Sequence, residues 1–97
     1  MRSVFWTRRA RHDLAAIRDF ISKDSAHYAE VVISGVIAAS EQAAQFPESG
    51  RMVPEYENPA IREVIRPPYR IVYRLIGADT IHILTIHHGA RRFPSEL

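Results

Sequence analysis

The sequence predicts an α+β domain in which a helical hairpin packs on one face of a small, mostly antiparallel sheet, in the order β-α-α-β-β-β. Three observations predict this fold. Apolar residues recur with a helical period between residues 10 and 46, and the period becomes that of strands after residue 60. No repeat or linker divides the 97 residues, of which 46% are hydrophobic and 25% charged. We therefore expect one domain over residues 1–97.

The N-terminal half is expected to form a short strand followed by two antiparallel helices. Residues 3–6 are mostly apolar, and Thr7 offers an N-cap hydroxyl. Apolar stripes with spacings of three and four residues are Ala10, Leu14, Ile17 and Ile21, then Ala29, Val32, Val36, Ala39, Ala43 and Phe46. Asp24 and Ser25 are expected to end the first helix and cap the second, and they leave room only for a tight hairpin between the stripes. Gly35, inside the second helix, is expected to mark close helix packing.

After residue 46 the pattern predicts a long irregular segment and then three strands. Three of the six prolines and one of the four glycines fall between residues 47 and 60. A loop of that length in a small domain is often functional. The following segments are rich in branched and aromatic residues, as strands are, over residues 61–66, 69–76 and 80–87.

Alternation along residues 69–76 divides the side chains between two faces. The row expected beneath the helices is Tyr69, Ile71, Tyr73 and Leu75, and the row expected on the open face is Arg70, Val72, Arg74 and Ile76. We prefer a three-residue turn over 66–68, which pairs Ile65 with Tyr69 and puts Arg62 beside the Arg70 row. A two-residue turn is the alternative and inverts this arrangement. The open-face guanidinium groups are expected to point outward toward an anionic partner.

The charge distribution favours such a partner. Lys23 is the only lysine, so twelve of the thirteen basic residues are arginine, and the formal net charge is +2. Residues 60–97 contain six arginines but only three acidic residues. A positive field of this kind attracts nucleic acid or an acidic protein segment. The alternative explanation for the high ratio of arginine to lysine is a GC-rich genome, which encodes arginine in place of lysine.

Several chemistries are excluded by composition and spacing. The absence of cysteine removes disulfides, thiolate zinc sites and a cysteine nucleophile. No glycine-rich phosphate loop and no G-x-S-x-G motif is present. His82 and His88 are expected on one face but about 20 Å apart, and His87 and His88 on opposite faces. We therefore expect no metal site and no cofactor.

The chain is expected to be cytoplasmic and independent of membranes. No apolar run approaches the ~20 residues that span a bilayer, and the opening residues 1–6 are too short for a signal peptide. The remaining candidate site is the end of the last strand, with Arg70, His87, His88, Arg91 and Arg92, and with Glu55, Glu63 and Tyr73 nearby. Such a set could perform metal-free phosphodiester chemistry or bind an acidic partner.

An ordered set of residues runs from Val4 to about Arg92 and is most distinctive over residues 69–74 and 83–92. In these residues the chain resembles toxins of the RelE/ParE superfamily from type II toxin–antitoxin systems. The resemblance implies a toxin that is neutralised by the C-terminal segment of a cognate antitoxin. The toxin would contact operator DNA only through that antitoxin. The residues expected to bind the antitoxin or the target are Arg62, Arg70, Tyr73, Arg74, Arg91 and Arg92.

The superfamily has two branches, and the residues favour one of them. ParE-like toxins poison DNA gyrase, whereas RelE-like toxins cut mRNA on the ribosome. RelE-like nucleases have a lysine pair that this chain lacks. Residues 94–97 of this chain occupy the place of the catalytic tyrosine of those nucleases. We expect a gyrase inhibitor of the plasmid-stabilisation type and no enzymatic activity. The alternatives are a metal-independent endoribonuclease and a degenerate toxin that only binds antitoxin; the nuclease residues would be Glu63, Arg70, His88 and Arg91.

Overall fold

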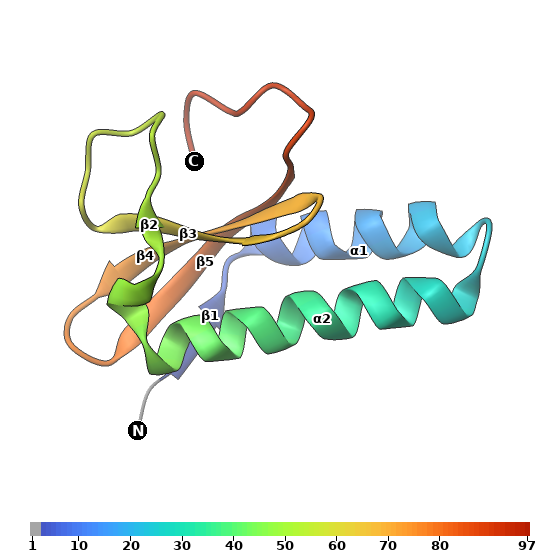
Figure 1. The fold of residues 1–97 in the computed structure, drawn as a ribbon, viewed down its shortest axis with the longest axis horizontal. Helices are drawn as coiled ribbons and strands as arrows, with labels where there is room; N and C mark the ends of the chain where they lie inside the picture. The colour runs from blue at the N-terminus through green and yellow to red at the C-terminus, as the bar shows by residue number, and fades with distance from the viewer. Residues whose placement is uncertain (1–2) are drawn as a thin grey trace.

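A computed structural model describes residues 3–97 and confirms the helical hairpin packed on a sheet (Figure 1). Met1 and Arg2, part of the opening considered above as a signal peptide, lie outside the described residues. The elements in chain order are β1 (Ser3–Trp6), α1 (Arg8–Ser22), α2 (Ala26–Gln45), the 3₁₀ helix η1 (Pro47–Ser49), β2 (Arg51–Met52), β3 (Ile61–Arg66), β4 (Tyr69–Ile76) and β5 (Thr80–His88).

The sheet is mixed, with one parallel pair at its edge. The strand order is β1-β5-β4-β3-β2; β1 runs parallel to β5 and the other neighbours are antiparallel. The short strand β2 lies within the segment predicted to be irregular, so that prediction missed a strand of two residues. Within residues 3–97, neither helix combines the length and the apolar composition needed to cross a membrane.

Both helices begin at the predicted caps. The Thr7 side chain accepts a hydrogen bond from the Ala10 N–H at 3.2 Å, and its hydroxyl donates to the Ile83 carbonyl of β5 at 2.7 Å. The Ser25 side chain accepts from the Tyr28 N–H at 3.0 Å and starts α2. Thr7 therefore satisfies a free helix N–H and also joins the β1–α1 corner to the sheet.

Apolar side chains are buried on both faces of the sheet. The main core, between the helices and the sheet, includes Ala10, Val36, Ala43, Tyr69, Ile71, Tyr73, Ile81, Ile83 and Ile86. A smaller cluster contains Val53, Ile61 and Val72, covered by Tyr56, Leu84 and Phe93. Figure 1 shows the segment after β2 and the C-terminal segment on the side of the sheet away from α2. The face predicted to be open is therefore partly covered.

The β3–β4 hairpin uses the two-residue turn, so the preferred register is wrong. Arg66 lies opposite Tyr69, Ile65 opposite Arg70, and Glu63 on the face away from the helices. The prediction failed because β3 carries apolar side chains on both faces, and its alternation therefore does not select one of them. The ion pair of Glu63 with Arg70 favours the observed register.

A β-bulge in β5 changes which side chains share a face. One extra residue, Leu84, shifts the register partway along the strand. His82 consequently lies opposite Arg74 and His88 opposite Tyr69, so the two histidines are on different faces and the prediction that they share one is wrong. Because the bulge shifts the alternation of side chains between the two faces, three isoleucines at irregular spacing all lie in the main core: Ile81, Ile83 and Ile86.

Gly35 has a different neighbour from the one expected. A Cβ atom at this position would lie 2.5 Å from a terminal nitrogen of Arg66, which comes from β3. The glycine therefore makes room for a guanidinium group, and the prediction that it marks contact between the two helices is wrong.

Asp13 connects α1 to β5. Its carboxylate accepts hydrogen bonds from the Thr85 hydroxyl and, at 3.3 Å, from the Ile86 backbone N–H. Thr85 is buried, so its hydroxyl depends on this acceptor. The contact sets the position of the helix over the strand.

Replacing Asp13 with alanine should lower the free energy of unfolding by about 1–3 kcal/mol, because the Thr85 hydroxyl and the Ile86 N–H would lose their acceptor. Denaturant unfolding followed by circular dichroism measures the change. Asp19→Ala, an exposed position on the same helix, is the matched control and should be nearly neutral. Equal losses in the two variants would contradict the assignment.

Candidate functional site

Four charged side chains form a cluster on the face of the sheet away from the helices. We call Arg51, Glu55, Glu63 and Arg70 the arginine–glutamate cluster. The Glu63 carboxylate is 0% exposed and accepts from the Nε atoms of Arg51 and Arg70, each at 2.6 Å. Both terminal nitrogens of Arg70 donate to the Glu55 carboxylate, at 2.9 and 2.7 Å. Arg70 is thus bound by two carboxylates, with bidentate geometry toward one of them.

The C-terminal segment covers this cluster. The Phe93 ring lies over Arg70, with 4.1 Å between the guanidinium carbon and the ring centroid. The same ring contacts His87 and Tyr56, and the Tyr56 hydroxyl donates to the Pro94 carbonyl at 2.6 Å. The Arg70 side chain is only 13% exposed, so the prediction that it points outward toward a partner is wrong.

The pKa values within the cluster follow from this pairing. Hydrogen bonds from Arg70 lower the pKa of Glu55 from its ordinary value of 4.5 to about 2. The Glu55 carboxylate, and then Glu63, raise the pKa of Arg70. Both groups therefore stay charged at neutral pH, and neither is suited to exchange protons with a substrate there.

Arg62 and Tyr73 fix the segment over residues 47–60 to the sheet. Arg62 donates to the carbonyls of Pro59, Glu48 and Gly50, at 2.9, 3.1 and 3.1 Å. Tyr73 is 0% exposed, and its hydroxyl donates to the Pro47 carbonyl at 2.7 Å. Desolvation raises the pKa of Tyr73. The prediction that Tyr73 contacts a partner is wrong, because its side chain has no accessible surface.

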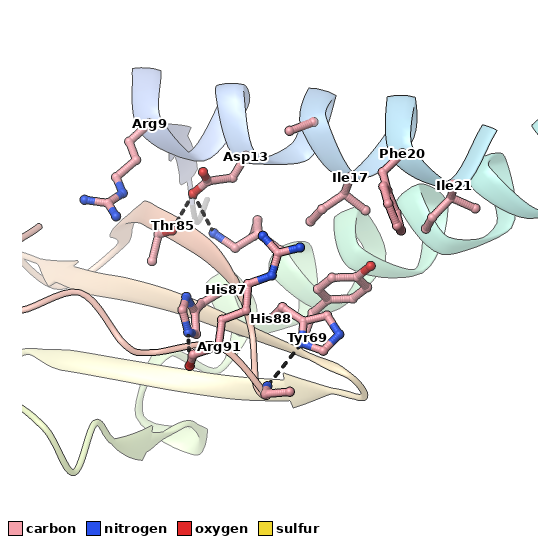
Figure 2. Close-up of a pocket in the computed structure, with 13 residues that line it drawn as sticks. Arg9, Asp13, Ile17, Phe20, Ile21, Tyr69, Thr85, His87, His88 and Arg91 are labelled. Atoms are coloured by element: carbon pink, nitrogen blue, oxygen red, sulfur yellow. Dashed lines mark hydrogen bonds between the residues drawn. The ribbon is translucent and has the colours of Figure 1, made fainter. Parts of the chain in front are cut away.

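A groove of about 690 Å³ lies between α1 and the end of β5 (Figure 2). Toward the C-terminal end of α1 its wall is apolar, and Phe20 on that part of the wall is 67% exposed. Arg9 and Arg91 supply positive charge, and Figure 2 shows the Arg91 side chain reaching toward α1. The other labelled lining residues are Asp13, Ile17, Ile21, Tyr69, Thr85, His87 and His88. The groove thus combines an apolar wall with basic groups, which suits an amphipathic acidic segment.

The two neighbouring histidines lie on opposite faces, as predicted. His87 is opposite Arg70 and contacts Phe93, whereas His88 is opposite Tyr69, with 5.6 Å between the ring centroids. The His87 Nε2 lies 3.0 Å from the Arg91 carbonyl, and the His88 Nδ1 accepts from the Ala90 N–H at 3.1 Å. The part of the chain that the structure describes contains no group of three or more side chains placed to bind a metal ion.

The structure separates the residues predicted for the nuclease alternative. Glu63 and Arg70 are paired with each other on one face, and His88 is on the other. Arg91 lines the groove. Arg74 and Arg92 are exposed, without an ion pair to any residue from 3 to 97, so their predicted contacts with a partner stay predictions.

Sequence reasoning missed Phe20 as a groove residue and Phe93 as the cover of Arg70. Phe20 lies outside the core stripe of α1, and a large aromatic residue in such a position is a signal of an exposed binding surface. Phe93 gave no signal, because its contact with Arg70 depends on how the C-terminal segment folds back over the sheet.

Replacing Glu63 with alanine should destabilise the protein by about 3 kcal/mol, because Arg51 and Arg70 would lose a fully buried partner. Chemical denaturation provides the measurement. Glu57→Ala, exposed in the same covering segment, should change stability by less than about 0.5 kcal/mol. A nearly neutral Glu63 variant would show that the cluster does not support the fold.

The lowered pKa of Glu55 predicts acid sensitivity with a defined sign. An acid whose folded pKa of about 2 lies below its ordinary 4.5 stabilises the fold above pH 4.5, and this contribution is lost as the pH falls toward 2. The stability difference between wild type and Glu55→Gln should therefore shrink over this range in thermal unfolding experiments. The matched Glu57→Gln variant should show no such trend, and a pH-independent difference for Glu55→Gln would refute the prediction.

Comparison with known proteins finds a matching family and two similar toxins. Residues 4–93 match the family described as "ParE toxin of type II toxin-antitoxin system, parDE". "Toxin RelE2" of Caulobacter vibrioides is 38% identical over 92 residues, covering 94% of this chain and 99% of that protein. "Putative toxin Y4kP" of Sinorhizobium fredii is 31% identical over 96 residues, covering 97% and 95%.

A solved structure is similar in both fold and sequence. The structure described as "Chromosomal ParDE TA system from P. aeruginosa" superposes with a TM-score of 0.72 and 28% identity, covering 91% of this chain and 96% of the other. The helical hairpin on a mixed sheet derived above is therefore the architecture of that protein as well. The match over residues 4–93 and the shared fold show that this chain belongs to the ParE toxin family of type II toxin–antitoxin systems.

Proposed function

We propose that this toxin inhibits DNA gyrase in the cytoplasm and does not cleave mRNA on the ribosome. The observation that carries the proposal is the separation of the candidate nuclease residues. Glu63 and Arg70 form an ion pair with each other in the arginine–glutamate cluster, whereas His88 lies on the opposite face of the sheet. A metal-free nuclease needs an acid, a base and cations that meet at one phosphate.

The charge states of the cluster support the same proposal. A general base works best with a pKa near the operating pH. Glu55 has a pKa of about 2, and Arg70 has a raised pKa. Opening the cluster to admit RNA would also require the buried Glu63 carboxylate to lose its arginine partners.

One relative favours the second candidate function. The name of the Caulobacter vibrioides protein, "Toxin RelE2", refers to the other branch of the superfamily. The family description and the solved structure both refer to ParE or ParDE. An endoribonuclease is therefore the alternative function, and the experiment on the purified toxin must test for it.

A toxin of a type II system has a cognate antitoxin, and we propose that the groove beneath α1 binds its C-terminal segment. The exposed Phe20 and its apolar neighbours would take the apolar side of an amphipathic segment, while Arg9 and Arg91 would meet its carboxylates. Contact with operator DNA would occur only through the antitoxin.

The purified toxin should inhibit supercoiling of relaxed plasmid by DNA gyrase at micromolar concentration, and addition of the antitoxin should restore supercoiling. Primer extension on translated mRNA should show intact message in the same preparations. If gyrase is unaffected and the message is cut in the ribosomal A site, with loss of cutting in Arg70→Ala, the nuclease alternative is correct. Neither activity, with growth unaffected on expression alone, would indicate a degenerate toxin.

A further inference from the structure

Arg66, at the end of β3, lies against helix α2. A Cβ atom at Gly35 would be 2.5 Å from a terminal nitrogen of Arg66, and 2.9 Å from both its Cζ and its Nε. The guanidinium group therefore occupies the space that any side chain at position 35 would need. The absence of a side chain at position 35 lets Arg66 lie against the helix, and this explains a glycine in the interior of α2, where it is unfavourable for the helix itself.

Arg66, like Arg74 of β4, has no side-chain partner among residues 3–97, whereas three other arginines of the sheet do. Arg51 and Arg70 form ion pairs, and Arg62 donates to three carbonyls. Arg66 is exposed and forms no ion pair or hydrogen bond with another residue from 3 to 97 through its side chain. Its five N–H donors are therefore free to bind an anion, and their planar arrangement matches a carboxylate.

A small apolar pocket lies beside this free guanidinium group. The pocket has a volume of about 130 Å³ and is lined, besides Arg66, by Tyr28, Val31, Val32, Pro67, Pro68 and Tyr69. Tyr28 and Val31 are exposed although they are large and apolar. Tyr69 also lines the larger groove, so one bound segment could reach both cavities.

We propose that Arg66 binds a carboxylate of an acidic peptide segment, and that a neighbouring apolar side chain of the same segment enters this pocket. The inference rests on the proposed function and deepens it, because the segment belongs to the antitoxin. Gly35 is a positioning residue for Arg66. A single guanidinium group beside an apolar pocket suits a carboxylate next to an apolar side chain. A nucleic acid backbone would need several cations in a row.

The test uses the protein encoded by the reading frame adjacent to this gene as the probe. Titration calorimetry measures its affinity for wild-type toxin and for the Arg66→Ala and Gly35→Ala variants. Both should bind roughly tenfold or more weakly, since a charge-assisted hydrogen bond is lost or misplaced. Arg11→Ala and Ser34→Ala, at exposed positions of α1 and α2, are the matched controls and should bind like the wild type.

Thermal unfolding separates recognition from folding. Gly35→Ala should unfold at the same temperature as the wild type or higher, because alanine is the better helix former and only the flexible end of Arg66 must move. Weaker binding together with unchanged or raised stability is the expected signature. A fall in the unfolding temperature of Gly35→Ala would instead assign the glycine to packing and overturn the positioning role.

Substituting the acidic residues of the probe protein by glutamine identifies the partner of Arg66. One such substitution should weaken binding to the wild type but not to Arg66→Ala. Wild-type affinity in both Arg66→Ala and Gly35→Ala overturns this inference and leaves the proposed function intact. No binding to the wild type overturns both this inference and the proposed binding of the antitoxin in the groove, while gyrase inhibition is decided separately by the supercoiling assay. Loss of binding to a single-stranded RNA oligonucleotide in Arg66→Ala, with the probe protein unaffected, would identify a nucleic acid site and contradict the proposal.

Discussion

The buried carboxylate of Glu63 is the constraint on which the sheet depends. A fully buried carboxylate is unfavourable unless it is paired and hydrogen-bonded. Its two partners, Arg51 and Arg70, come from the strands on either side of β3. These pairs match the observed β3–β4 register and join β2 to the sheet. Arg70 in turn binds Glu55, and so attaches the segment that covers this face.

The cluster also shows that some of the chain's arginines stabilise the fold itself. Arg51, Arg62 and Arg70 serve the fold, by pairing with carboxylates or with backbone carbonyls. Among the arginines without an ion pair to residues 3–97, Arg9 and Arg91 line the groove and Arg66 lines the small pocket, whereas Arg74 and Arg92 are exposed elsewhere. Part of the positive charge therefore lies beside apolar cavities, a combination that favours peptide segments over a nucleic acid backbone.

Helix α2 extends beyond β3, so the closed end of the helical hairpin has no strand beneath it. Helix α2 has 20 residues and β3 has six, which correspond to about 30 Å and about 20 Å. Figure 1 shows the closed end of the helical hairpin projecting past the β3–β4 turn. Side chains near that end, such as Phe20 and Tyr28, consequently remain exposed. An exposed apolar surface of this kind is typical of a protein that functions with a bound partner.

Local sequence determined the helices, both N-caps and the three long strands, because periodicity and capping depend on residues a few positions apart. The ordered set of residues from Val4 to Arg92 also indicated the superfamily. Tertiary structure alone decided the β3–β4 register, the bulge at Leu84 and the burial of Arg70. It also decided which side chain lies against Gly35. Each of these features depends on segments that are distant in the chain. For the β3–β4 hairpin, the alternation of apolar residues allows two registers, and the need to pair the buried Glu63 carboxylate selects one of them.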